Sequence, residues 1–369
     1  MTTFDFQPRT RVVFGTGSIQ RLGELAASLG GSRVLLVSDP GIVAAGHPQT
    51  AIRLLTAAGI ECFLFDNVAE NPTTDHVNAG LEFVQGRGVD LIIGLGGGSS
   101  LDCARGINFL LTNGGQMADY WGVGKASKPM LPFISIPTTA GTGSEAQSYA
   151  LIADPQTHRK MACGDPKAAA AIAPLDPELT LTQPVQVTAA TGMDAIVHAL
   201  ETLVATKRNP ISEVFSQRAW QLLSRNYPLV LSEPDDLEAR AGMLLGAHFA
   251  GAAIENSMLG AAHACANPLT ARFDVTHGAA VGLMLPAVIR FNALQQAALY
   301  ETVGGAEHVT RQVEDLLGQA TLPARLSEYG IAENDVPQLA ADAAKQWTAQ
   351  FNPRPVELND FVGLYQSVL

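Results

Sequence analysis

The first hundred residues contain near-continuous apolar runs of strand length that alternate with segments of helical periodicity. The runs lie at residues 33–38, 61–65 and 90–95, and a shorter one at 11–14 precedes them. A strand that is apolar on both sides has to be covered on both faces, which is the pattern of a parallel sheet with helical crossovers. We therefore expect a doubly wound, nucleotide-binding type of α/β domain in the N-terminal half.

Helices are expected between these strands, and the composition changes past Pro184. From there on the periodicity predicts helices with no clear strands among them, at residues 188–206, 211–226, 235–256, 258–267, 278–291, 293–301, 307–318, 323–329 and 336–349. The boundary falls near residues 180–187. The prediction is an α/β dinucleotide-binding domain over residues 1–183 and an all-helical, metal-binding and catalytic domain over 184–369.

Charge and cysteine usage exclude several classes of partner. The 369 residues carry a formal net charge of −12, which disfavours nucleic acid and anionic membranes. The stretch from Met1 to Asp5 has no basic segment followed by an apolar run, and no run approaches about 18 uninterrupted apolar residues, so neither a signal peptide nor a membrane span is expected. The four cysteines lack paired metal-site spacing and are expected to be reduced and mostly buried in a cytoplasmic protein.

A glycine-rich turn follows the predicted strand at 90–95. Gly96, Gly97 and Gly98 stand in a row, and Ser99-x-x-Asp102 fits a capping box for the helix that comes next. Glycines allow close backbone approach, and a helix start offers free amides to phosphate, so the turn is a candidate pyrophosphate site. A tight strand-to-helix turn is the alternative, and the spacing is not the G-x-G-x-x-G fingerprint.

A second polar loop and one aspartate extend this candidate cofactor site. The loop runs over residues 137–145 and is rich in threonine and glycine, so it could hold phosphate or ribose oxygens or be a plain connector. Asp39 ends the strand at 33–38 and could accept both ribose hydroxyls of an adenosine. A carboxylate there repels a 2′-phosphate, which favours NAD over NADP. Its alternative role is to start a turn before Pro40 and Gly41.

The helical half contains a pattern that suits a metal ion. Asp194 and His198 stand four residues apart, so they project from one face of a helix. Thr191-x-x-Asp194 also fits a capping box at the opening of that helix, which is the alternative. His263 and His277 both lie among small and apolar residues. Three imidazoles and one carboxylate suit Fe²⁺, Zn²⁺ or another first-row divalent ion, and Cys265 is then expected to pack rather than to ligate. A cofactor on one domain and a metal on the other predict a cleft between domains.

These motifs together resemble a known family. The stretches 96–102, 137–145, 191–198 and 263–277 stand in the order found in the iron-containing (group III) alcohol dehydrogenases, which are related to lactaldehyde/1,2-propanediol oxidoreductase, glycerol dehydrogenase and dehydroquinate synthase. The resemblance covers nearly the whole chain. It implies an α/β domain of the dehydroquinate synthase type that binds NAD(P), an all-α C-terminal domain, and homodimers or larger homo-oligomers.

The resemblance also implies functional residues. The catalytic metal, Fe²⁺ with Zn²⁺ as the alternative, is expected on Asp194, His198, His263 and His277. The cofactor contacts implied are Asn71, Gly97, Gly98, Ser99, Asp102, Thr138, Thr139, Thr142 and Lys160. The implied activity is hydride transfer between a small alcohol or aldehyde and nicotinamide. A zinc-dependent glycerol or polyol dehydrogenase, a lyase like dehydroquinate synthase and a non-catalytic nucleotide- or metal-binding protein are the alternatives.

One residue departs from the family pattern. Many members have a histidine where this chain has Asn267, and that histidine has been thought to help move the proton. Asparagine can hydrogen-bond but does not titrate near neutral pH. We therefore expect proton exchange through water or the cofactor ribose hydroxyls. His248, which matches no ligand position, is expected to be a packed core residue.

Overall fold

The computed structural model describes residues 3–157 and 159–369, which form two compact units. One unit comprises Gln7–Thr139 and Gly143–Thr182. The other contains a short N-terminal piece that ends at Phe6, the segment Ala140–Thr142, and Gln183–Leu369. Met1 and Thr2, part of the N-terminal stretch considered for a signal peptide, lie outside the described residues.

The first unit is built on a parallel sheet. Its strands are β1 (Arg11–Phe14), β2 (Arg33–Val37), β3 (Glu61–Phe65), β4 (Leu91–Gly96), β5 (Gly122–Val123), β6 (Phe133–Pro137), β7 (Tyr149–Ala153), β8 (Lys160–Gly164) and β9 (Ile172–Leu175). Six of them form a sheet in the order β1-β9-β6-β4-β2-β3, with every pairing parallel. The expected doubly wound α/β domain is confirmed.

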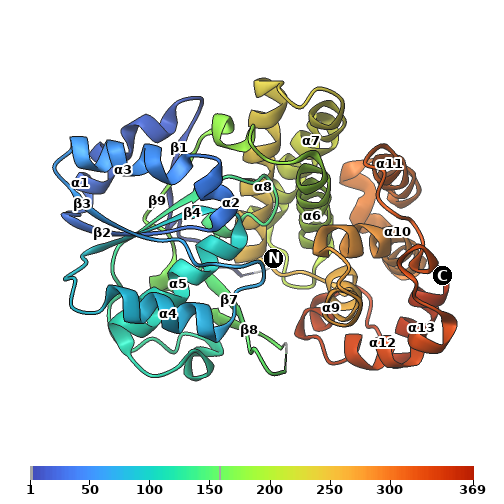
Figure 1. Cartoon of the computed structure of the whole chain (residues 1–369). Helices are drawn as coiled ribbons and strands as arrows, with labels where there is room; N and C mark the ends of the chain where they lie inside the picture. The colour runs from blue at the N-terminus through green and yellow to red at the C-terminus, as the bar shows by residue number, and fades with distance from the viewer. Residues whose placement is uncertain (1–2, 158) are drawn as a thin grey trace. The chain divides into compact units, whose positions relative to one another are not determined.

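Helices cover both faces of this sheet, as the apolar strands require (Figure 1). The helices of this unit are α1 (Leu22–Ser28), α2 (Pro40–Ala44), α3 (His47–Ala57), α4 (Thr74–Val84) and α5 (Gly98–Asn113), with 3₁₀ turns η1 (Ser18–Arg21), η2 (Met117–Tyr120), η3 (Ser144–Ala146), η4 (Pro166–Ala168) and η5 (Pro177–Thr180). Along β2, Val34 and Leu36 pack with α1 and α3, whereas Leu35 and Val37 pack with α4 and α5.

A smaller sheet was not expected from the sequence. Its three strands lie in the order β5-β8-β7, and β7 and β8 form an antiparallel hairpin. Leu151 is exposed on β7 while Ile152 is buried, so the strand shows the two-residue alternation of a half-buried sheet. The short helix α2 was also missed, because the Asp-Pro-Gly sequence at residues 39–41 was interpreted as a turn.

Among its described residues, the second unit has only helical elements, which loops connect. Its helices are α6 (Val185–Val204), α7 (Pro210–Ser232), α8 (Leu237–Asn256), α9 (Ala261–Phe273), α10 (His277–Gln296), α11 (Ala306–Gln319), α12 (Val336–Ala343) and α13 (Leu358–Gln366), with 3₁₀ turns η6 (Ala297–Val303), η7 (Leu326–Tyr329), η8 (Glu333–Asp335) and η9 (Trp347–Phe351). The predicted helix at 293–301 covers the end of α10 and most of η6, and the one at 323–329 contains only the 3₁₀ turn η7. Helix α13 was not predicted.

Neither of the two capping boxes that the sequence allows is present in the structure. Helix α6 begins at Val185 after Pro184, so Thr191 and Asp194 lie in its middle, far from any free helix-start amide. Helix α5 begins at Gly98 with Gly97 at its N-cap and no side-chain cap, so Ser99 is already inside the helix. Asp194 and Asp102 are therefore available for other contacts.

One helical stretch is long and apolar enough to cross a membrane by length and composition alone. It runs over His277–Val303, and 72% of its most apolar window is buried inside the structure. That degree of burial is typical of a core helix.

Burial predicts that the thiols react slowly in the native chain. All four cysteines are free, and burial raises the pKa of Cys62, Cys103 and Cys163 to about 12. Because the thiolate is the reactive form, little of it exists at about pH 8. We expect slow reaction with an aromatic disulfide reagent in buffer and rapid reaction of all four thiols in guanidinium chloride. Rapid labelling of Cys103 in the native chain would contradict this.

Candidate metal site and cofactor loops

Helix α6 supplies two of the predicted ligands from one buried face. Asp194 and His198 are both 5% exposed, and one helical turn separates them. The Nε2 atom of His198 lies 3.3 Å from Oδ1 of Asp194. The helix has no polar stripe of its own here, since residues 192–204 are all buried.

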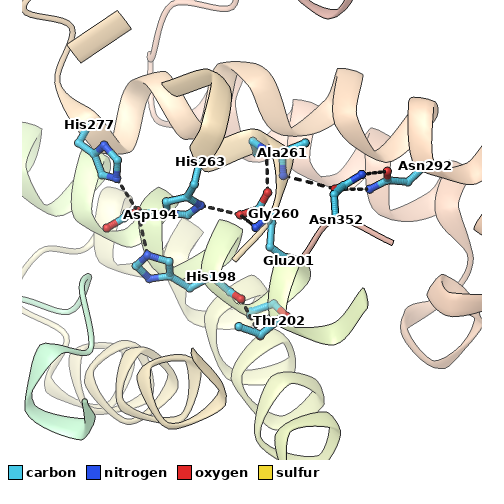
Figure 2. Close-up of polar contacts among 12 residues, drawn as sticks. Asp194, His198, Glu201, Thr202, Gly260, Ala261, His263, His277, Asn292 and Asn352 are labelled. Atoms are coloured by element: carbon cyan, nitrogen blue, oxygen red, sulfur yellow. Dashed lines mark hydrogen bonds and ion pairs between the residues drawn. The ribbon is translucent and has the colours of Figure 1, made fainter. Parts of the chain in front are cut away.

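Two further histidines converge on the same carboxylate oxygen (Figure 2). His263 lies in the first turn of α9, and its Nε2 is 3.5 Å from Oδ1 of Asp194. His277 is the first residue of α10, and its Nε2 is 3.8 Å from that oxygen. The rings of His198 and His263 stack with centroids 4.9 Å apart. The structure therefore brings together all four residues predicted as ligands.

These separations fit a tetrahedral metal site. With metal–ligand bonds of about 2.1 Å, the ligand atoms of a tetrahedron lie about 3.4 Å apart. Asp194, His263 and His277 offer ligand atoms within 4.8 Å of one another. Among the described residues, Oδ1 of Asp194 and Nε2 of His263 are buried without a hydrogen-bond partner. Buried polar atoms without partners are uncommon, and a cation at their centre would satisfy them.

The electrostatics of the cluster favour a cation. Burial raises the pKa of Asp194, but His198 and the other imidazoles outweigh burial and hold that pKa well below its usual range. Burial lowers the pKa of His198. It also opposes protonation of His263, yet the carboxylates of Glu201 and Asp194 raise the pKa of His263 to about 9. Without metal the cluster therefore holds a proton, which a metal ion has to displace.

A glycine lets α10 approach α6 closely enough to deliver His277. A Cβ atom on Gly278 would lie 1.9 Å from the carbonyl oxygen of Ala190. That oxygen belongs to the backbone of α6 and cannot move aside without moving the helix. The position next to His277 therefore has to be glycine if the two helices are to keep this distance.

Substitution of Gly278 by alanine tests this packing. The added methyl group has to separate α10 from α6, so His277 moves away from Asp194. We expect metal affinity to fall at least about 10-fold, with about 1–3 kcal/mol lost from the free energy of unfolding through overpacking. The control is Gly318→Ala on α11, where a Cβ meets nothing within 4 Å. Isothermal titration with Zn²⁺ measures both variants, and unchanged affinity in Gly278→Ala would refute the packing argument.

The glycine-rich turn lies at the carboxyl end of β4. The amide of Thr138 donates to the carbonyl of Gly96, and a Cβ on Gly97 would lie 3.5 Å from Thr139. The amide of Asn71 donates to Oγ of Ser99 at 3.3 Å. The structure thus brings six predicted cofactor contacts to one place: Asn71, Gly97, Gly98, Ser99, Thr138 and Thr139. The uncapped start of α5 leaves backbone amides there, which is the feature that binds phosphate.

Asp39 lies beside this turn and also begins α2. Its Oδ1 accepts a hydrogen bond from the amide of Ile42, and its Oδ2 accepts one from the hydroxyl of Ser100 at 2.8 Å. Asp39 therefore has a local structural role, as the N-cap of α2 rather than as the turn residue of the alternative. A carboxylate oxygen has two acceptor positions, so these bonds leave capacity for ribose hydroxyls.

Asp102 is enclosed rather than open to a ligand. Its Oδ1 accepts from the hydroxyl of Ser144 at 2.8 Å and from Arg105, and its Oδ2 accepts from the amide of Leu151. Arg105 is 1% exposed and also donates to backbone carbonyls. Burial raises the pKa of Asp102, while Arg105 opposes this. These contacts tie α5 to the second loop and to the small sheet.

The other two predicted contacts lie in different surroundings. Thr142 is half-buried and belongs to the segment Ala140–Thr142, which groups with the helical unit. In that segment a Cβ on Gly141 would lie 2.6 Å from the Cβ of Thr191 on α6, so the loop packs tightly on the helix that carries Asp194. Lys160 is exposed at the start of β8.

Glu201 lies at this cluster and was not predicted from the sequence. This residue is 3% exposed on α6, and its carboxylate accepts from Nδ1 of His263 at 2.6 Å. The only sequence signal was its position, seven residues after Asp194 on the same helical face. Glutamates on helices are usually solvated, so this signal was weak.

Three other residues that the sequence singled out have defined surroundings. Asn267 is half-buried one turn after His263, and its Nδ2 donates to Oε1 of Gln346 at 3.0 Å. Cys265 is buried, and its carbonyl accepts from the hydroxyl of Tyr365. His248 is 7% exposed and lies against Phe249, which agrees with its predicted role as a packed residue.

Comparison with protein families now decides the relationship. Residues 8–177 match the family model described as iron-containing alcohol dehydrogenase, and residues 188–369 match the C-terminal model of the same family. The chain belongs to the iron-containing alcohol dehydrogenase family. The prediction of an oxidoreductase of this family is confirmed.

Individual relatives span nearly the whole chain. It is 34% identical to "Alcohol dehydrogenase 4" of Schizosaccharomyces pombe over 97% of this chain and 87% of that protein. It is 30% identical to the "NAD-dependent methanol dehydrogenase" of Bacillus methanolicus over the full length of both. Among solved structures, a 1,3-propanediol oxidoreductase is 31% identical with a TM-score of 0.96, and both chains are covered completely. A sulfoacetaldehyde reductase from Bifidobacterium kashiwanohense in complex with NAD⁺ is 25% identical with a TM-score of 0.91, over 100% of this chain and 99% of that one.

Proposed function

We propose that this member of the family is an NAD-dependent alcohol dehydrogenase that interconverts small alcohols and aldehydes with a divalent metal, Fe²⁺ or alternatively Zn²⁺. The observation that carries the proposal is the convergence of three Nε2 atoms on one oxygen of a buried carboxylate, at 3.3, 3.5 and 3.8 Å. That donor set suits a first-row divalent ion.

The metal ligands proposed are Asp194, His198, His263 and His277. When bound, such an ion acts as a Lewis acid that polarises an alcohol or carbonyl oxygen, which favours hydride exchange with nicotinamide. The chain itself holds the proposed metal ion among buried, apolar side chains. Asn267 can orient a hydrogen bond but holds no titrating proton, so this position supplies no acid or base.

For the cofactor, we propose that the turn at Gly97, Gly98 and Ser99 binds pyrophosphate through the amides at the start of α5. Asn71, Thr138 and Thr139 line the same place and are proposed as further contacts. Asp39 is proposed to accept the adenosine ribose hydroxyls. Asp102 is proposed to act indirectly on cofactor binding, because it fixes Ser144. Thr142 and Lys160 remain proposed as cofactor contacts.

The segment 1–183 is accordingly proposed as the dinucleotide-binding domain and 184–369 as the metal-binding, catalytic domain. We further propose that the protein is a cytoplasmic homodimer or larger homo-oligomer. The free, protonated thiols support a reducing compartment. The edge strand β1, with Val12 and Phe14 exposed by 39% and 45%, supports pairing with another copy.

The function is tested by following NADH absorbance with a panel of small alcohols after supply of Fe²⁺ or Zn²⁺. We expect one metal ion per chain by elemental analysis. Asp194→Ala and His277→Ala should lower kcat by more than about 100-fold while circular dichroism stays unchanged, because ligands are removed without emptying the core. The control is His308→Ala, whose side chain is exposed on α11. Active protein without metal would defeat the proposal.

Cofactor choice is tested at Asp39. Asn keeps an oxygen that can accept from the amide of Ile42 and so preserves the helix start, but it removes the charge that repels a 2′-phosphate. We expect Asp39→Asn to lower the ratio of kcat/KM with NAD to that with NADP by about 10-fold, an energy of about 1.4 kcal/mol. Asp66→Asn, at an exposed carboxylate after the neighbouring strand β3, is the matched control. Equal use of both cofactors by the unmodified protein would show that Asp39 does not select.

A further inference from the structure

Glu201 is a buried carboxylate outside the ligand set. It lies on α6, three residues after His198 and seven after Asp194, and it is 3% exposed. A charged side chain in such a place is costly unless partners satisfy it. Its partners therefore indicate what it does.

The hydrogen bonds that Glu201 accepts from described residues come from one short segment at the start of α9 (Figure 2). Its Oε2 accepts from Nδ1 of His263 at 2.6 Å and from the amide of Gly260 at 3.0 Å. Its Oε1 accepts from the amide of Ala262 at 2.6 Å. One carboxylate thus holds the imidazole of the proposed ligand His263 and the backbone of two residues that precede it.

A second side chain holds the same helix start without touching the imidazole. Helix α9 has no side-chain cap of its own. The amide of Ala261 donates to Oδ1 of Asn352 at 3.3 Å, and Asn352 is fixed by Asn292 at 2.7 Å. The amides at the start of α9 are therefore shared between Glu201 and Asn352, so the two contributions can be separated by substitution.

The contact with Nδ1 also determines the chemistry of the ring. A carboxylate only accepts hydrogen bonds, so Nδ1 of His263 is the donor and carries the hydrogen. The neutral ring then has its lone pair on Nε2, the atom that lies 3.5 Å from Oδ1 of Asp194. A carboxylate behind a metal-bound histidine fixes the tautomer and the orientation of the ring and raises the basicity of the ligand.

We propose that Glu201 is a positioning residue, which holds His263 in the tautomer and orientation that bind the metal. The inference rests on the proposed metal site. It assigns to Glu201 no contact with substrate or cofactor.

The first test is the Kd for Zn²⁺, measured against a competing chromophoric chelator in the metal-free full-length protein. Glu201→Gln keeps the size of the side chain but can accept with only one oxygen, so either His263 or the amide of Ala262 faces an NH₂ group. We expect its Kd to rise about 10- to 100-fold. Asn352→Ala disturbs the same helix start and leaves the imidazole contact, so its Kd should change less than about 3-fold.

The second test uses the wild-type protein, so its result does not depend on whether a variant folds. In the Zn²⁺-loaded wild-type protein labelled with ¹⁵N-histidine, long-range ¹⁵N–¹H spectra report the tautomer of each ring. We expect His263 to carry its hydrogen on Nδ1, with Nε2 shifted as a metal ligand. A hydrogen on Nε2 would overturn the proposal.

The outcomes separate this inference from the proposed function. Should Glu201→Gln bind Zn²⁺ as the wild type does, or should Asn352→Ala lose as much affinity as Glu201→Gln, positioning by Glu201 is refuted while the metal site stands. Failure of the wild-type protein to bind any divalent metal refutes the proposed function, and this inference with it.

Discussion

The helical unit depends on one buried negative charge. Asp194 lies in the middle of α6, within a stretch where nearly every side chain is enclosed. An isolated carboxylate in such a place would take up a proton rather than remain charged. It remains charged because imidazoles from α6, α9 and α10 surround it, and they lower its pKa despite its burial. The packing of three helices is therefore tied to the neutralisation of one charge.

The sheet produces a strong local signal in the sequence, and the proposed metal ligands produce a moderate one. Strands such as residues 33–37 are apolar on both sides, and only a sheet covered on both faces explains that pattern. Asp194 and His198 were recognised from their spacing along a helix, and His263 and His277 from their apolar surroundings. These patterns can be recognised without the tertiary structure, because each lies within a short stretch of sequence.

Other features could not be predicted because they depend on contacts between distant segments. Thr191 and Asp194 match a capping box, yet α6 starts several residues earlier, and no local pattern fixed that start. Asp102 fits the same motif but pairs with Arg105 and Ser144 inside the unit. The roles of Glu201 and Gly278 appear only when α9 and α10 are placed against α6. A glutamate on a helix and a glycine after a histidine are otherwise unremarkable.

The wide spacing of the proposed ligands along the chain has a consequence for the durability of the fold. Asp194 and His277 are about 80 residues apart in sequence, so only the folded chain holds them close enough to share the proposed cation. An ion that binds only the folded state also makes unfolding depend on its free concentration. With the proposed ion bound, the resistance of this protein to heat or denaturant would depend on the free metal concentration of the solution, and a chelator would lower stability as well as activity.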